Sequence, residues 1–236
     1  MAKEQYGYKY RFIFPDGRDR TFELRLDDTL KLLLSESADY PDWTRLSCNQ
    51  CPGCPLRESE NPRCPVAVSL IEPIEFFKDA LSVEEVDVEI ESPTRTYIKR
   101  KVLLSHGVSC LFGIYMVTSG CPILGKLKPM VRTHLPFATL KETAYRVIGM
   151  YLLGQYFMAR RGKAADWDLK GLISLYKEIT KVNRSFCDRL HLVCAQDASL
   201  NAVVHLNCFA DNSAIVLEKI GLQEIEKSFD EFLAGG

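Results

Sequence analysis

The chain has 236 residues, of which 47% are apolar, enough to bury a sizeable core in one large domain or two small ones. Its formal net charge is −1, from 30 basic and 31 acidic side chains, whereas nucleic-acid binders usually carry a basic domain or stripe. We therefore expect no nucleic-acid partner, and we interpret the short basic run at residues 99–101 as a solvated strand end.

Targeting and redox signals favour a cytoplasmic protein. The opening segment MAKEQYGYKYRFIF has no apolar core of the kind found in signal peptides. The most apolar stretch, residues 102–120, contains His106 and two glycines and falls short of the about 20 apolar residues that a membrane span needs. We expect it to be a buried helix, with no membrane partner. The nine cysteines, an odd number, argue against a disulfide framework.

The first part of the chain predicts strands. A hairpin is expected from YKYRFIF and TFELRL, with Pro15, Asp16 and Gly17 at the turn, because apolar residues alternate on both sides of it. A short helical piece is expected at residues 27–37, and a helix broken near Pro73 at residues 65–81. Residues 83–92 and 94–104 predict a second strand pair.

From about Val102 the apolar period changes from 2 to 3.6, which predicts helices. One begins at Thr139, which forms a capping box with Glu142. Another begins near Asp166, with Asn183 beside its apolar stripe as a candidate for a polar pocket or for packing specificity. A third begins near residues 197–199, and residues 222–236 predict a short amphipathic helix.

Strands that precede helices without alternation define an α+β fold. We expect an N-terminal antiparallel sheet of about four strands followed by a C-terminal helical bundle. Residues 1–236 are interpreted as a single domain. Its sheet half, with a cysteine loop, covers residues 1–104, and its helical half covers residues 105–236.

The loop CNQCPGCPLRESENPRCP carries four cysteines, Cys48, Cys51, Cys54 and Cys64. Pro52 and Gly53 favour a turn that directs two sulfurs toward one ion, and the polar segment RESENPR offers little to bury. We therefore expect metal ligation, rather than hydrophobic burial, to hold the loop. A redox disulfide and an inert loop are the weaker alternatives.

The identity of the metal stays open at this point. Four thiolates suit a structural zinc ion, which we favour. The alternative is a [4Fe-4S] cluster, because C-x2-C-x2-C with a distant Cys-Pro is similar to iron–sulfur ligation. Zinc can also be held by two of the first three cysteines, Cys64 and one ligand outside the loop, which would leave Cys48 as a spectator.

The segment TSGCPILGKLKPMVRTHLPF, residues 118–137, is long for a loop and contains candidate catalytic residues. A short helix beginning at Pro122 would place Cys121 at its N-cap, where a thiol pKa is lowered. One hypothesis is a site made of Cys121, Arg132 and His134, with Arg146 and Tyr151 from the next helix. The alternative is a buried cysteine and two polar residues that shape a loop.

The segments CPGCPL, CPVA, TSGCP, PM and HLPFATLKETAYR…YLLGQYF resemble a family of uncharacterised bacterial proteins of about this length. The resemblance spans most of the chain from Cys51 onward. It implies a shared fold and a shared site around Cys51, Cys54, Cys64, Cys121 and His134, and it transfers no catalytic role. Because Cys48 lies outside this pattern, the fourth ligand is open among Cys48, Cys121 and His134.

The leading hypothesis is a cytoplasmic metal-binding protein whose cysteine loop holds zinc and joins the two halves. A nearby polar pocket with Arg132 and His134 would bind a small anion or a protein partner. The rival hypothesis is a redox or thiol-dependent enzyme that uses an iron–sulfur cluster or Cys121. A third is a protein-binding scaffold with a purely structural zinc ion.

Overall fold

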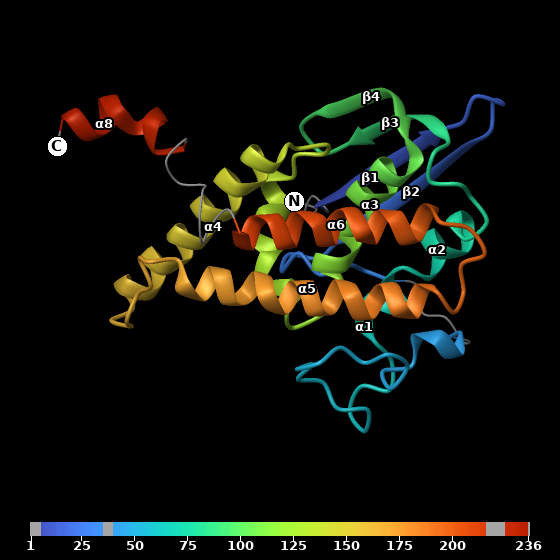
Figure 1. Ribbon diagram of the computed structural model, residues 1–236, viewed down its shortest axis with the longest axis horizontal. Coiled ribbons are helices and arrows are strands. Elements are labelled where there is room, and N and C mark those ends of the chain that lie inside the picture. Colours follow the sequence, from blue (N-terminus) through green and yellow to red (C-terminus); the bar gives the residue numbers. More distant parts are fainter. Residues whose placement is uncertain (1–5, 35–39, 216–224, 236) are drawn as a thin grey trace, which may run out of the picture.

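The computed structural model describes residues 6–34, 40–215 and 225–235, which form an α+β fold (Figure 1). The strands are β1 (Tyr6–Ile13), β2 (Asp19–Leu26), β3 (Glu85–Glu91) and β4 (Thr96–Leu103). The α-helices are α1 (Pro65–Ser69), α2 (Ile71–Phe77), α3 (Leu104–Thr118), α4 (Leu140–Arg160), α5 (Lys170–Leu190), α6 (Ala198–Ile215) and α8 (Asp230–Ala234). Three 3-10 helices, η1 (Asp42–Thr44), η2 (Leu124–Thr133) and η4 (Lys227–Phe229), complete the described elements.

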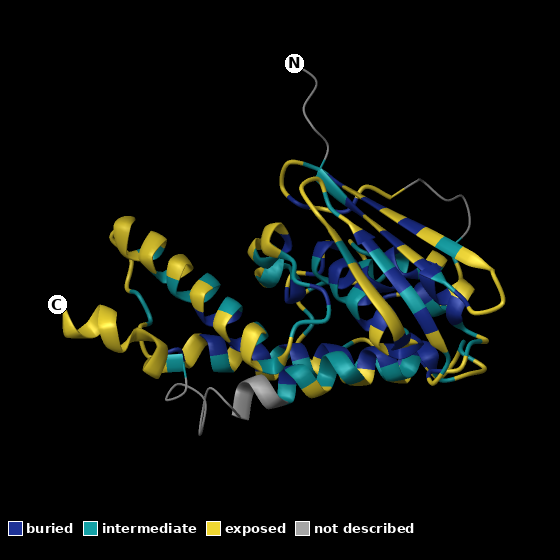
Figure 2. Ribbon diagram, turned by 90° about the horizontal axis from the view of Figure 1, so that it is seen from above, coloured by how far each residue is buried: buried dark blue, intermediate teal, exposed yellow. Residues whose placement is uncertain are grey.

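The four strands form one antiparallel sheet in the order β2-β1-β3-β4. Tyr10 of β1 lies opposite Phe22 of β2 and Ile90 of β3, so its inward-facing neighbours are all apolar. Intervening residues such as Arg11 point outward to charged partners, among them Asp19 at 2.9 Å. Figure 2 shows this alternation of buried and exposed residues along the strands, with one face left to solvent. The period of 2 predicted from the sequence therefore fixes which face of the sheet is buried.

Helix α3 follows β4 directly and is largely buried, because apolar residues cover most of its circumference. At Gly107 it approaches the sheet so closely that an added Cβ atom would lie 2.8 Å from Phe12 Cε1 and 3.0 Å from Val88 Cγ2. At Gly113 it faces Leu206 of α6 instead. The molecule thus has three layers: the sheet, then α3, then the antiparallel pair α5 and α6 (Figure 1).

Most predicted elements are confirmed. The hairpin, the second strand pair and the buried helix at residues 104–118 are present, and Thr139 forms the expected capping box with Glu142. Pro65 begins a helix, as expected for proline at a first helical position.

The helix expected at residues 27–37 is wrong for its described part. Residues 27–34 form turns in which Leu26 pairs with Leu32, because Asp27 accepts backbone bonds that close a turn. The predicted break at Pro73 falls instead at Leu70, between α1 and α2. Part of the predicted C-terminal helix, residues 222–224, lies outside the described residues.

A membrane-spanning helix must be both long and apolar. None of the described helices is long enough and apolar enough to cross a bilayer.

The tight approach of α3 to the sheet is tested by Gly107→Ala. The new methyl group collides with Phe12 and Val88, so we expect a loss of about 1–3 kcal/mol in the free energy of unfolding. The matched control is Gly149→Ala on α4, where nothing lies within 4 Å and the change is expected to stabilise by up to about 1 kcal/mol. Urea denaturation of both variants measures the difference, and equal effects would contradict the packing described.

Candidate functional site

Four cysteines from distant parts of the chain line one small cavity. Cys51, Cys54 and Cys64 come from the cysteine loop, and Cys121 follows the end of α3. The cavity has a volume of about 20 Å³, which is room for about one water-sized particle. Cys48 does not line it. Of the open fourth positions, the structure therefore brings Cys121 to the loop cysteines.

The local geometry of the loop cysteines follows from the residues between them. Cys51 and Cys54 flank a turn in which Gly53 has φ of +79° and the Cys54 N–H donates to the Cys51 carbonyl at 3.0 Å. A positive φ costs glycine little, so Gly53 favours this turn. Cys64 immediately precedes α1, and its N–H donates to the Thr44 carbonyl at 2.8 Å.

Cys121 is buried and lies one turn before η2. The backbone N–H groups of Ile123 and Leu124 face its sulfur and act to lower its pKa. Burial acts in the opposite direction and is the larger effect, so the net pKa of Cys121 is raised. The expected low-pKa thiol at a helix N-cap is therefore wrong: the N-cap is Ile123, and the thiol is protonated at neutral pH.

The neighbouring thiols also affect the pKa of Cys51. The pKa of Cys51 is raised to about 12, first by burial and then by the neighbouring thiols of Cys54, Cys64 and Cys121. Within the described residues, however, no three His, Cys, Asp or Glu side chains form a group arranged to hold a metal ion. Metal binding thus stays a prediction, for the set that includes Cys48 as well as for the set that lines the cavity.

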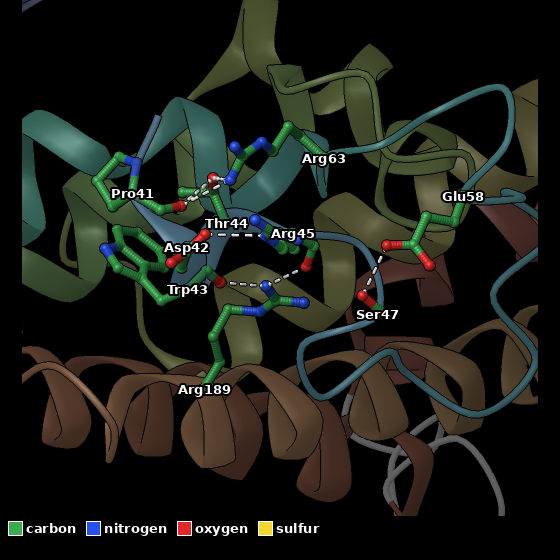
Figure 3. A network of polar contacts seen from close by, with 9 residues as sticks. All are labelled: Pro41, Asp42, Trp43, Thr44, Arg45, Ser47, Glu58, Arg63 and Arg189. Atoms are coloured by element: carbon green, nitrogen blue, oxygen red, sulfur yellow. Dashed lines mark hydrogen bonds and ion pairs between the residues drawn. The ribbon is translucent and has the colours of Figure 1, made fainter. Parts of the chain in front are cut away.

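A buried arginine anchors the cysteine loop to α5. Arg189 is only 2% exposed, and its guanidinium donates to the backbone carbonyls of Trp43 and, at 2.8 Å, of Arg45 (Figure 3). Arg189 also lines the cysteine cavity. A positive charge is therefore held beside four sulfurs by contacts to neutral oxygens.

The stem of the loop has its own hydrogen bonds. The Leu46 N–H donates to the Pro62 carbonyl at 3.0 Å, and Arg63 donates to the Pro41 carbonyl and the Thr44 hydroxyl (Figure 3). Leu46 itself is 1% exposed. The expectation that metal ligation alone holds this loop is corrected, because backbone bonds and one buried leucine also hold it.

The structure does not assemble the predicted catalytic cluster. Cys121 lies in the cysteine cavity, whereas His134 and Arg146 line a different and larger cavity. Arg132 is exposed, with its guanidinium 5.4 Å from the centre of the Tyr6 ring. Tyr151 donates to Asp166 at 2.8 Å, at the connection between α4 and α5. Cys121 precedes η2 and His134 follows it, so these two residues, although close in sequence, line different cavities.

His134 is held by the tyrosines of the sheet. Its Nε2 lies 2.5 Å from the Tyr10 hydroxyl, and its ring contacts Tyr8 edge-on at 5.3 Å. Desolvation by burial, followed by the charge of Arg146, lowers its pKa to about 3. His134 is therefore neutral in the folded protein at ordinary pH.

Sequence reasoning missed Arg189. The available signal was its position within the apolar stripe of α5, three residues after Phe186 and seven after Val182. A charged residue at such a position must find buried partners, but the sequence does not say which ones.

The fold and its site define a class: an α+β protein with four cysteines around one cavity where its sheet-bearing and helical parts meet. A family model described as Domain of unknown function (DUF6901) matches residues 8–230, and the chain belongs to this family. No curated protein and no solved structure matches the chain. The expected membership of a family without assigned activity is confirmed.

The anchoring role of Arg189 is tested by Arg189→Met. Two charge-assisted hydrogen bonds are lost and two carbonyls lose their partner, so we expect a loss of about 2 kcal/mol or more in unfolding free energy. Hydrogen exchange should also speed up in residues 41–64. The control is Arg184→Met, on α5 like Arg189, which removes an exposed ion pair to Asp211 of α6 and should cost less than about 1 kcal/mol. Unchanged exchange in the loop of Arg189→Met would contradict the anchor.

The depressed pKa of His134 predicts a pH dependence of stability. Below pH 6.5, the pKa of histidine in the unfolded chain, the unfolded chain binds a proton on His134 that the folded chain does not bind. The free energy of unfolding therefore falls as pH drops from 6.5 toward about 3. We expect His134→Gln to reduce this slope by up to about 1.4 kcal/mol per pH unit. The measurement is unfolding free energy from pH 5 to 8, with the exposed His191→Gln as control. A slope unchanged in His134→Gln would show that His134 takes up its proton in the folded state.

Proposed function

We propose that this protein binds one zinc ion through Cys51, Cys54, Cys64 and Cys121, and that the ion joins the cysteine loop to the end of α3. The observation that carries the proposal is that these four cysteines, separated by up to 70 positions in the sequence, line one cavity. Four cysteines are a complete ligand set for a structural zinc ion.

The donor set fits zinc in number, type and charge. Four thiolates around Zn²⁺ carry a net charge of −2, and the buried Arg189 guanidinium beside them offsets part of it. The N–H groups of Ile123 and Leu124 that face the Cys121 sulfur are donors of the kind that stabilise a thiolate. A buried charge placed next to four thiols is costly for the fold unless those thiols become an anionic site.

The size of the cavity favours a single ion over a cluster. A volume of about 20 Å³ holds roughly one water-sized particle, whereas a [4Fe-4S] cluster has eight atoms in its core. Ligation still requires side-chain adjustment, because the described cysteines do not form a coordinating group as they lie. The adjustment is modest in kind, since a cysteine sulfur moves between staggered positions by rotation about one bond.

The proposal assigns the metal a role in folding rather than in catalysis. A reducing compartment keeps thiols available as ligands, so we place the protein in the cytoplasm. The rival thiol-dependent enzyme is less well supported, because burial raises the pKa of Cys121.

Elemental analysis of anaerobically purified protein tests the proposal. We expect about one zinc per chain. Cys64→Ser and Cys121→Ser should lose most of it, whereas Cys48→Ser and the exposed Cys208→Ser should retain it. Iron in the elemental analysis, together with visible absorption, would indicate an iron–sulfur cluster instead of zinc. Full metal retention in Cys121→Ser would overturn the proposed ligand set.

A second measurement needs no variant and so does not depend on how well variants fold. Thiol titration of the native protein should show at least the four ligand cysteines protected, and a strong chelator should increase the number of reactive thiols by four. Identical titrations with and without chelator would sink the proposal.

A further inference from the structure

A second, much larger cavity lies between α3, η2, the start of α4, α5 and α6, and it shares no residue with the cysteine cavity. Its volume of about 540 Å³ falls within the range of small-molecule sites, about 300–1,000 Å³. Most of its wall is apolar, for example Met116 of α3, Leu127 of η2, and Leu206 and Phe209 of α6. Five helical segments therefore surround a space suited to an apolar ligand body.

Two polar side chains on this wall have polar atoms that make no hydrogen bond to a described residue. Arg146 of α4 donates through Nη2 to the Met130 carbonyl at 3.2 Å, but its buried Nε has no hydrogen-bond partner within the described structure. Asn183 of α5 is only 2% exposed, and its side chain makes no hydrogen bond to any described residue. Leaving the buried Nε of Arg146 unsatisfied is costly, and both side chains offer hydrogen-bonding groups to a ligand in the cavity.

The charges around the cavity select the sign of the ligand. None of the residues that line it is Asp or Glu, whereas two cationic side chains, Arg146 and Lys99, do line it. Three histidines also line it: His106 and His205, whose ring centroids lie 4.4 Å apart, and His134, which is neutral at ordinary pH. Lys99 is exposed, so positive charge also reaches the surface beside the cavity. An anion is favoured here and a cation is disfavoured.

We propose that this cavity binds a small amphipathic carboxylate, with the carboxylate on Arg146, the apolar body against α3 and α6, and Asn183 as a second polar contact. A planar guanidinium with a free Nε–H matches a carboxylate in geometry as well as in charge. The proposal gives a location and a chemical class to the anion pocket expected from the sequence, with Arg146 in the place assigned there to Arg132. It uses none of the four proposed zinc ligands and is independent of the zinc site.

Isothermal titration of the full chain with octanoate and with 1-octanol tests the assignment. We expect wild-type protein to bind octanoate at one site and at least about tenfold more tightly than 1-octanol, because only the carboxylate pairs with Arg146. Arg146→Gln should weaken octanoate by about tenfold or more and leave 1-octanol unchanged. The control Arg160→Gln, exposed on the same helix, should bind like wild type.

The outcomes separate this proposal from the zinc proposal. Equal affinity of wild type for octanoate and 1-octanol, no octanoate binding at millimolar concentration, or unchanged binding in Arg146→Gln would each overturn it. The wild-type comparison stands even where Arg146→Gln fails to fold. Zinc content measured on the same samples reports the cysteine site alone, so either proposal can fail while the other holds.

Discussion

The close packing of α3 on the sheet is the contact on which the rest of this structure depends. Without a side chain at Gly107, the helix lies directly on Phe12 and Val88. Its position then sets both candidate sites. The end of α3 leads into Cys121, which reaches the loop cysteines, and another side of the helix forms a wall of the large cavity. A helix held further from the sheet would shift both cavities at once.

Helix α5 is the second element that the two sites share. Ile179 and Asn183 face the large cavity, whereas Val182, Phe186 and Arg189 face the cysteine cavity. Adjacent residues on one helix point about 100° apart, so a single helix can wall two separate spaces. This arrangement explains why a stripe that looks like ordinary core in sequence also carries two buried polar residues.

The two sites differ in how the protein provides for charge. In the small cavity a buried cation, Arg189, lies beside four thiols that would become anionic on binding the proposed metal ion. In the large cavity Arg146 stands among apolar side chains with no acidic residue on the wall. Neither arginine forms an ion pair with a carboxylate of the described residues, and burying an arginine in this way is costly, so an anionic species would stabilise the fold at both positions.

The sequence by itself determined the class of fold and most elements, because alternation of Tyr8, Tyr10 and Phe12 and the capping box at Thr139 are local patterns. It also marked out the cysteine loop and, through resemblance, the importance of Cys121. Only the tertiary structure decided which side chains meet. Cys121 lines the same cavity as three loop cysteines, whereas Cys48 does not. Arg132 lies over the Tyr6 ring and lines neither cavity, and Arg189 anchors the loop. Those outcomes depend on packing between segments far apart in the chain. The burial that raises the pKa of Cys121 depends on the same packing, so local sequence patterns do not predict it.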